Sequence, residues 1–173
     1  MPATYEPIAT TTLSSAASTV SFTSISQSYT DLAIIVYAKG TASSHLYARW
    51  GNGSYDSGNN YSNTGLYSRT TTNDYDVSRN TNVSWARLSP YTYGVPSATF
   101  GTTLTSLQNY SNTTTFKTAL SRVASIGAAE YAGTEVAVHQ WRSTSAINQI
   151  QFLMASGSLE TGTTITIYGI KAA

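Results

Sequence analysis

The chain has 173 residues, of which 53 are serine or threonine and only 17 are charged (9 basic and 8 acidic), and it contains no cysteine. A length of this order predicts one domain, and the shortage of helix-favouring residues argues against an all-α fold. The lack of cysteine excludes a disulfide scaffold, a cysteine-ligated zinc site and a thiol nucleophile. The net charge of +1 gives no basic footprint for a nucleic-acid backbone, so we expect no nucleic-acid partner.

The N-terminal region is rich in threonine and serine and shows no regular hydrophobic period. We therefore expect residues 1–18 to form an extended N-terminal arm and residues 19–173 to form a single β-sandwich domain. The first 30 residues contain no lysine or arginine, so no secretory signal peptide is expected. The longest apolar run, residues 32–38, is far shorter than the ~20 residues that cross a bilayer, and we expect no membrane partner.

Strand patterns begin after this region. Residues 31–39 are apolar at both odd and even positions, which predicts a central strand buried on both faces. Residues 45–50 alternate and end at Gly51-Asn52-Gly53, a strong turn signal. The polar segment 54–82 is the least hydrophobic part of the chain, and we interpret it as long loops around one edge hairpin near Leu66-Tyr67.

The second half of the chain contains further strand patterns separated by polar turns. They cover residues 83–88, 103–109, 115–126, 134–142, 147–154 and 163–170. One helical pattern, at residues 118–129, competes with the strand pattern there. The total of eight to ten short strands predicts an all-β fold, an antiparallel β-sandwich or barrel in which alternate residues face a core.

The sequence shows no complete catalytic motif. Neither Gly51-Asn52-Gly53-Ser54 nor Gly157-Ser158 completes the G-x-S-x-G turn of many serine hydrolases. His45 and His139 both fall in strand patterns beside bulky aromatic neighbours, which favours a structural role over that of a catalytic base. We therefore predict that the protein is not an enzyme and has no catalytic residue and no cofactor.

Asp74 and Asp76 form a close carboxylate pair. Residues at i and i+2 of a strand share one face, so this pair is the candidate for a metal site, or for acid–base work on a glycosidic bond in a glycan-degrading domain. The surrounding run Thr-Thr-Thr-Asn-Asp-Tyr-Asp is more typical of a solvated loop, in which Asn and Asp bond to their own backbone. We therefore assign no metal.

Aromatic side chains supply the candidate contact surface. Tyrosine in or near polar loops stacks on sugars or packs against partner proteins at low entropic cost, although ordinary surface tyrosine of a β-sheet is the alternative. The tyrosines in such positions are Tyr55, Tyr61, Tyr67, Tyr75, Tyr91 and Tyr93. Of the three tryptophans, Trp50, Trp85 and Trp141, we expect at least two to lie in the core.

Segments near both ends of the chain resemble a known group of proteins. They are YEPIATTTL at residues 5–13, SFTSI at 21–25, SYTDL at 28–32, AINQI at 146–150 and GTTITIYGIKAA at 162–173. They fall within residues 5–32 and 146–173, which together make up about a third of the chain, and Asn60-Tyr61-Ser62 adds a short match in the middle. These segments resemble small β-rich virion proteins of tailed phages, especially those of marine and freshwater cyanobacteria. Residues 68–129 show little resemblance.

The resemblance implies a jelly-roll-like module that is present in several copies on the virion surface, with a homotrimer as the oligomer it suggests. Such a module is similar to capsid decoration or cement proteins, which bind the major capsid protein or other virion subunits. The alternative is a tail-fibre or other tail-associated module that recognises host glycans. No catalytic residues transfer from the resemblance. In a decoration protein, Tyr5, Glu6, Pro7, Ile8 and Leu13 of the arm would add to a neighbouring subunit as a strand.

Overall fold

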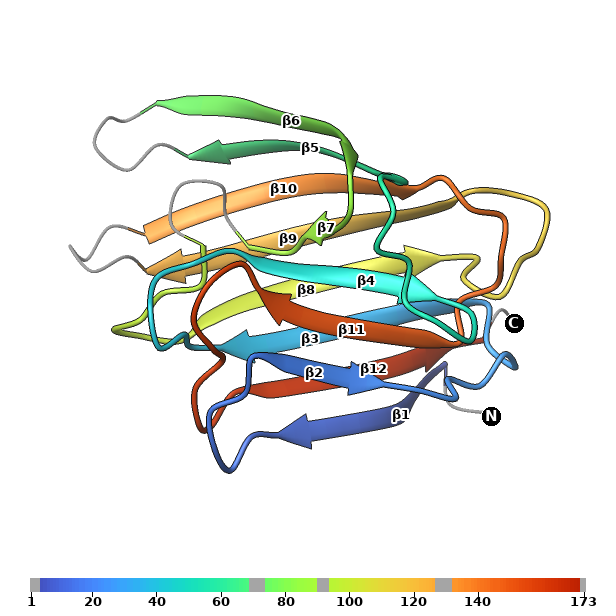
Figure 1. Ribbon diagram of the computed structural model, residues 1–173, viewed down its shortest axis with the longest axis horizontal. Coiled ribbons are helices and arrows are strands. Elements are labelled where there is room, and N and C mark those ends of the chain that lie inside the picture. The colour runs from blue at the N-terminus through green and yellow to red at the C-terminus, as the bar shows by residue number, and fades with distance from the viewer. Residues whose placement is uncertain (1–3, 69–73, 90–93, 127–131, 172–173) are drawn as a thin grey trace.

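Two antiparallel sheets, of eight and four strands, make up the described part of the chain, which contains no helix (Figure 1). The computed structural model describes residues 4–68, 74–89, 94–126 and 132–171. The strands are β1 (Tyr5–Thr12), β2 (Thr19–Phe22), β3 (Asp31–Ala38), β4 (Leu46–Gly51), β5 (Tyr61–Ser68), β6 (Tyr75–Val83), β7 (Ala86–Arg87), β8 (Gly101–Gln108), β9 (Lys117–Ile126), β10 (Ala132–Trp141), β11 (Gln149–Met154) and β12 (Thr164–Ile170). The predicted all-β sandwich is confirmed, with twelve strands rather than eight to ten.

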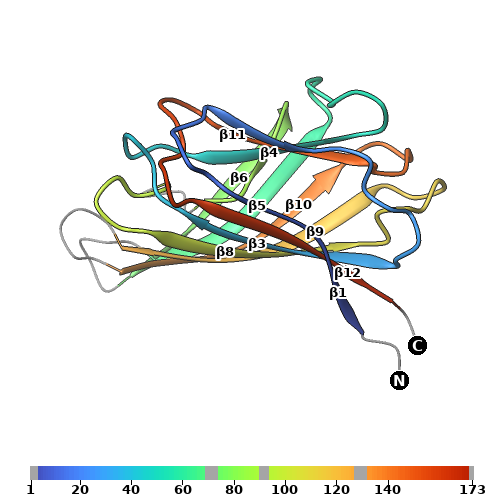
Figure 2. The ribbon, with the colours of Figure 1, turned by 90° about the horizontal axis from the view of Figure 1, so that it is seen from below.

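The larger sheet has the strand order β1-β12-β3-β8-β9-β10-β5-β6, and the smaller sheet has the order β2-β11-β4-β7. The smaller sheet covers one face of the larger sheet (Figure 2). Alternate residues of each strand face the space between the sheets, as expected for a half-buried strand. The buried apolar side chains include Phe22, Leu32, Ile34, Val36, Leu46, Trp50, Trp141, Ile150, Phe152, Ile165 and Ile167.

The tryptophan prediction is confirmed, because Trp50 and Trp141 are buried. Trp85 is half-buried and stacks on Tyr47, with 4.2 Å between the ring centroids. The prediction that residues 31–39 are buried on both faces is wrong at two positions. Ile35 and Tyr37 are exposed, since the smaller sheet covers the opposite face of β3.

Two segments that looked irregular or helical in the sequence are strands. The helical pattern at 118–129 lies largely in β9, where antiparallel pairing with both β8 and β10 outweighs local helix preference; its residues 127–129 fall outside the described part. The polar segment 54–82 contains β5 and β6, which pair along almost their whole length. The hairpin expected near Leu66 and Tyr67 is therefore much longer than predicted, and it forms one edge of the larger sheet.

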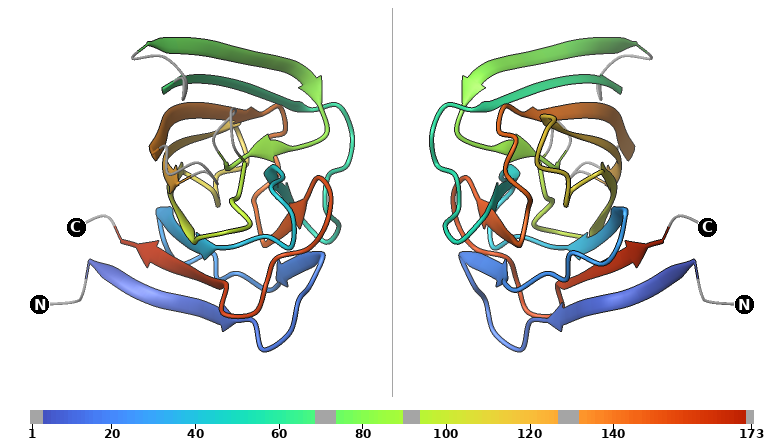
Figure 3. Two further views of the ribbon diagram at one scale, coloured as in Figure 1. Left: turned by 90° about the vertical axis from the view of Figure 1, so that its left-hand side faces the viewer. Right: turned by 90° about the vertical axis from the view of Figure 1, so that its right-hand side faces the viewer.

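The N-terminal segment is a strand of the protein's own sheet rather than an extended arm (Figure 3). β1 pairs with β12 from Tyr5 opposite Ile170 to Thr12 opposite Thr164. Ile8 and Leu13 pack against the core, and Leu13 also exchanges backbone hydrogen bonds with the segment around Thr163. The physical reason is that β1 packs its apolar side chains against the protein's own core and forms hydrogen bonds with the edge of β12 in the same chain.

Side chains hold β1 in this position as well. The Tyr29 hydroxyl donates to Oε2 of Glu6 at 2.9 Å, and Nζ of Lys171 lies 3.1 Å from Oε1 of the same carboxylate. The Tyr29 ring covers Gly169, where any larger residue would collide with the ring atoms. Hydrogen bonds from Tyr29 and Lys171 keep the pKa of Glu6 below its ordinary value, so this residue carries its charge at neutral pH.

Candidate functional site

The outer face of the larger sheet, which the smaller sheet does not cover, presents exposed apolar side chains. Strand pairing aligns four of them, together with the half-buried Leu104, in one row across the sheet, which we call the aliphatic row: Ile35, Leu104, Val136, Leu66 and Val77. Leu66 is 50% exposed and Val77 is 60% exposed. Leu120 and Val138, which are paired with each other, extend the apolar surface in the next row.

The charges on this face are few and of one sign over its centre. Arg122 lies within the aliphatic row between Leu104 and Val136, and Arg79 pairs with Thr64 in the adjacent row. Both arginines are exposed. Among the described outward positions of β3, β8, β9, β10, β5 and β6, the one carboxylate is Asp31, at the start of β3, where Oδ1 accepts a hydrogen bond from the Asn109 backbone. The face is therefore apolar and cationic.

The two edges of the larger sheet are protected against further strand pairing. On β6, Oδ1 of Asp74 accepts from the Tyr75 backbone N–H and Oδ1 of Asp76 accepts from the Val77 N–H, each at 2.8 Å. On β1, the register shifts between Pro7 and Ala9. Proline, bulges and charged side chains are among the means by which natural sheets prevent edge-to-edge association. A partner is therefore more easily accommodated on the face than at an edge.

The Asp74–Asp76 pair forms part of this edge, with Asp74 directly before β6 and Asp76 within it. Each carboxylate accepts a hydrogen bond from the backbone of the residue after it, but the loop interpretation of this run is wrong for Tyr75 and Asp76, which belong to strand β6. Oδ2 of Asp76 also accepts from the Tyr67 hydroxyl at 3.3 Å. Among the described residues, no three His, Asp or Glu side chains come together in a way that could hold a metal ion.

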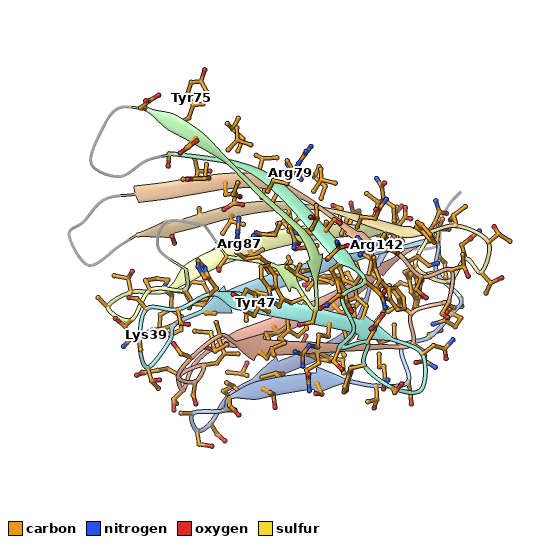
Figure 4. All side chains as sticks on the ribbon, turned by 45° about the horizontal axis from the view of Figure 1, so that its top comes forward. Lys39, Tyr47, Tyr75, Arg79, Arg87 and Arg142 are labelled. Carbon is orange, nitrogen blue, oxygen red and sulfur yellow. The ribbon has the colours of Figure 1, made fainter. Side chains whose placement is uncertain are left out.

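The predicted tyrosine surface is only partly present. Tyr61 is fully buried between Trp50 and Trp141, and Tyr67 is 8% exposed, so neither belongs to a contact surface. Both point inward because the alternation of β5 puts its odd-numbered residues on the inner face. Tyr75 is 70% exposed and projects from the start of β6, at some distance along the strand from Arg79 (Figure 4). Tyr91 and Tyr93 lie outside the described residues.

The interior between β7 and the β10–β5–β6 end of the larger sheet is polar. Arg87 forms a buried ion pair with Glu135 and also donates to Ser78 Oγ at 2.7 Å and to Asn80 at 3.2 Å. Gly65 on the neighbouring strand leaves room for the carboxylate, because a Cβ there would lie 2.2 Å from Oε1 of Glu135. Both charged side chains are at most 3% exposed, so this cluster lies inside the protein.

A chain of hydrogen bonds beside this cluster has the residue types of a hydrolase site. His139 Nε2 lies 2.9 Å from Ser121 Oγ, and His139 Nδ1 lies 2.8 Å from Asn63 Oδ1. All three side chains are at most 2% exposed, so no substrate reaches the serine. Burial lowers the pKa of His139 to about 3, which keeps the imidazole neutral. The arrangement therefore stabilises the interior, whereas a general base operates with a pKa near the working pH.

One open hollow lies on the loops that follow β4 and β10. Its volume is about 390 Å³, and it is lined by Gly51, Asn52, Ser54, Tyr55, Asp56, Ser57, Gly58, Trp141, Ser143 and Ser145. Tyr55, at its rim, is half-buried. Asp56 accepts hydrogen bonds from the Trp141 indole at 2.7 Å, from Asn60 at 2.9 Å and from the Gly58 backbone at 2.8 Å. Partial burial acts to raise the pKa of Asp56, but these hydrogen bonds together hold it below its ordinary value.

Comparisons with known proteins identify no family. No protein-family description and no curated protein matches the chain. Among solved structures, the chain is similar to an exo-inulinase from Aspergillus awamori, with 12% sequence identity and a TM-score of 0.45 over 96% of this chain. The chain spans 29% of the length of that protein, and a similarity at this level carries no functional argument. In the described residues there is no helix long and apolar enough to cross a membrane.

Proposed function

We propose that the protein is a non-enzymatic structural subunit of a tailed-phage virion, a decoration protein that binds the major capsid protein and reinforces the head shell. The observation that carries the proposal is the outer face of the larger sheet, with its aliphatic row and its two arginines. A face of this kind on a sheet with protected edges favours attachment by broad contact with a neighbouring subunit rather than by strand addition.

The size and charge of the face fit such a partner. Eight strands at ~4.8 Å spacing and about seven residues at ~3.3 Å each give an area of roughly 900 Å². A stable interface buries about 800 Å² on each partner. Because Arg79 and Arg122 are the charges over the centre of the face, we expect the capsid surface beneath it to combine apolar side chains with carboxylates.

The resemblance to phage virion proteins supports the proposal from the sequence side. The segments that carry it lie near the two ends of the chain, and the fold brings those ends together. β1, β12 and β3 are neighbours in the larger sheet, and β2 and β11 are neighbours in the smaller sheet. Apart from the short match Asn60-Tyr61-Ser62 at the start of β5, the resemblance therefore falls on neighbouring strands in one half of the sandwich.

Counting copies in purified particles tests the proposal. A decoration protein is present in hundreds of copies, binds emptied heads and raises their melting temperature. Absence from purified heads would overturn the proposal, and a few tens of copies on tails would favour the alternative, a tail-associated module. Light scattering of the isolated protein tests the predicted homotrimer in the same preparation.

Variants of the face test the mode of attachment. Leu66→Thr with Val136→Thr keeps β-branched or β-compatible residues on exposed strand positions, so the fold is retained while the apolar contact is lost. We expect weaker binding to emptied heads, and Gln151→Thr on the smaller sheet is the matched control. Arg122→Glu is expected to weaken binding further at low salt. Equal head binding by all of these variants would show that another surface makes the contact.

A further inference from the structure

We infer that the hollow on the β4–β5 and β10–β11 loops is a binding site for a neutral saccharide unit. This site lies on loops at the ends of β4 and β10, whereas the proposed capsid contact lies on the outer face of the larger sheet. The inference therefore does not depend on the virion role. Its volume of about 390 Å³ falls within the range of small-molecule sites, about 300–1,000 Å³.

The loop that forms the hollow is held in place by its own contacts. Gly51 permits the chain to fold back closely, since a Cβ there would lie 1.8 Å from the carbonyl oxygen of Ser54. Asn148 joins the two walls, because its backbone N–H donates to the Gly51 carbonyl and its side chain bonds to both Asn52 and the Gly53 backbone. A site that is already ordered loses less conformational entropy when a ligand binds.

The lining offers hydroxyl groups without internal partners. The side-chain hydroxyls of Ser54, Tyr55, Ser57 and Ser145 make no hydrogen bond to other described residues. Each can donate and accept, which matches the paired donor and acceptor character of sugar hydroxyls. The half-buried ring of Tyr55 adds an apolar surface of the kind on which sugar rings pack.

The charges of the lining restrict the ligand class. Asp56 is the one ionisable carboxylate among the ten lining residues, and none of the ten is cationic. Phosphate and acidic sugars would therefore meet a negative charge without a compensating arginine or lysine. A calcium or magnesium ion prefers several carboxylate or carbonyl oxygens, and the Asp56 oxygens are already occupied by Gly58, Asn60 and Trp141. A neutral polyhydroxyl ligand is not repelled by the charge of Asp56 and does not need several free carboxylate oxygens.

Trp141 provides a specific probe for the site. Its indole N–H donates to Asp56, and the protein has only three tryptophans, so its indole peak in a proton–nitrogen NMR spectrum can be assigned with Trp141→Phe. The probes are the methyl glycosides of glucose, galactose and mannose, together with methyl glucuronide as the acidic counterpart. We expect at least one neutral glycoside to shift the Trp141 peak in a saturable way and to leave the Trp85 peak unchanged.

Two matched variants separate binding from unfolding. Tyr55→Ser removes the ring at the rim, and Tyr75→Ser makes the same change on β6. We expect affinity to fall about tenfold or more in Tyr55→Ser, as for an aromatic contact residue, and to stay unchanged in Tyr75→Ser. The inference is overturned if no neutral glycoside shifts the Trp141 peak, if both variants bind alike, or if methyl glucuronide binds most tightly at low salt. Head binding by the same variants reports on the capsid contact separately.

Discussion

The guanidinium group of Arg87 lies 2.8 Å from Oε1 of Glu135, and this pair joins the smaller sheet to the larger sheet inside the sandwich. Arg87 belongs to the two-residue strand β7, so much of the contact between β7 and the larger sheet depends on its side chain. Buried ion pairs are costly to desolvate, and they stabilise a fold only when both partners are present and fully hydrogen-bonded.

Removing one member of this pair is expected to destabilise the protein strongly. Arg87→Met would leave Glu135 buried without its cation, and we expect a loss of about 3–5 kcal/mol in the free energy of unfolding. The double variant Arg87→Met with Glu135→Leu should lose less than the two single variants combined. Urea denaturation provides the measurement, and Arg79→Met, an exposed arginine on β6, is the control. Similar midpoints for Arg87→Met and Arg79→Met would contradict the prediction.

Stability is expected to fall in mild acid because of His139. Burial lowers its pKa from 6.5 to about 3, so between these values the unfolded chain binds a proton that the folded chain does not. The free energy of unfolding therefore decreases as the pH falls through this window, by about 2–3 kcal/mol at pH 4.5. His139→Gln should remove most of the slope between pH 6.5 and 4.5. An unchanged slope in that variant would assign the effect to other groups.

Lys117 is expected to give a pH dependence of the same sign at high pH. It is fully buried, and its Nζ donates to the carbonyls of Thr115 and Thr144 at 2.8 and 3.1 Å. Burial lowers its pKa below 10.5, so stability should rise with pH between the lowered pKa and 10.5, where the unfolded chain binds more protons. Above about pH 10 the buried Tyr61 opposes this, because burial raises its pKa and only the unfolded tyrosine ionises.

The comparison of Lys117→Met with Lys171→Met isolates the contribution of the buried Lys117 to the pH dependence of stability. Lys117→Met leaves two carbonyls without their donor, and we expect it to lower stability at pH 7 by about 1–3 kcal/mol. The rise between pH 8 and 10 should disappear in this variant and persist in Lys171→Met, because Lys171 is more than a third exposed. Chemical denaturation at several pH values supplies both quantities. Parallel pH curves for the two variants would refute the assignment.

Deleting residues 1–13 is expected to destabilise the sandwich, since β1 is part of it. The deletion uncovers the edge of β12 and removes Ile8 and Leu13 from the core, with an expected loss of about 2–4 kcal/mol. Amide hydrogen exchange gives a second measurement, because the β1 amides that bond to β12 should be protected in the intact protein. A detached arm would instead exchange rapidly, and its removal would leave the melting temperature unchanged.

Much of the fold follows from alternation in the sequence. The strand patterns at residues 45–50, 147–154 and 163–170 correspond closely to β4, β11 and β12, because apolar residues there recur at every second position toward one core. β5 was predicted only in part, around Leu66 and Tyr67, for a definite reason. Its inner face carries Asn63 and Gly65 between two tyrosines, so its sequence resembles a polar loop. The side chain that bonds to Asn63 comes from His139, far along the chain, and the sequence alone does not show this contact.

The candidate surfaces were harder to predict than the strands. Val136 and Val138 alternate with Ala137, so both faces of β10 are apolar in sequence, and only the position of the smaller sheet shows which face is exposed. Tyr55 was predicted at a contact surface from its loop composition, and it does lie at the rim of the hollow. The serines across the hollow, Ser143 and Ser145, reach it from a segment nearly ninety residues later.

The pairing of β1 with β12 also determines how the protein would respond to a pulling force. The first and last described segments meet at the same end of this antiparallel pair, where the Lys171 backbone N–H donates to the Thr4 carbonyl, and both ends of the chain leave the sandwich at one corner (Figures 1 and 2). Tension applied between the two ends would break the hydrogen bonds between β1 and β12 one after another, starting at the Thr4–Lys171 end. Tension applied between one end and the outer face of the larger sheet would instead load many bonds together.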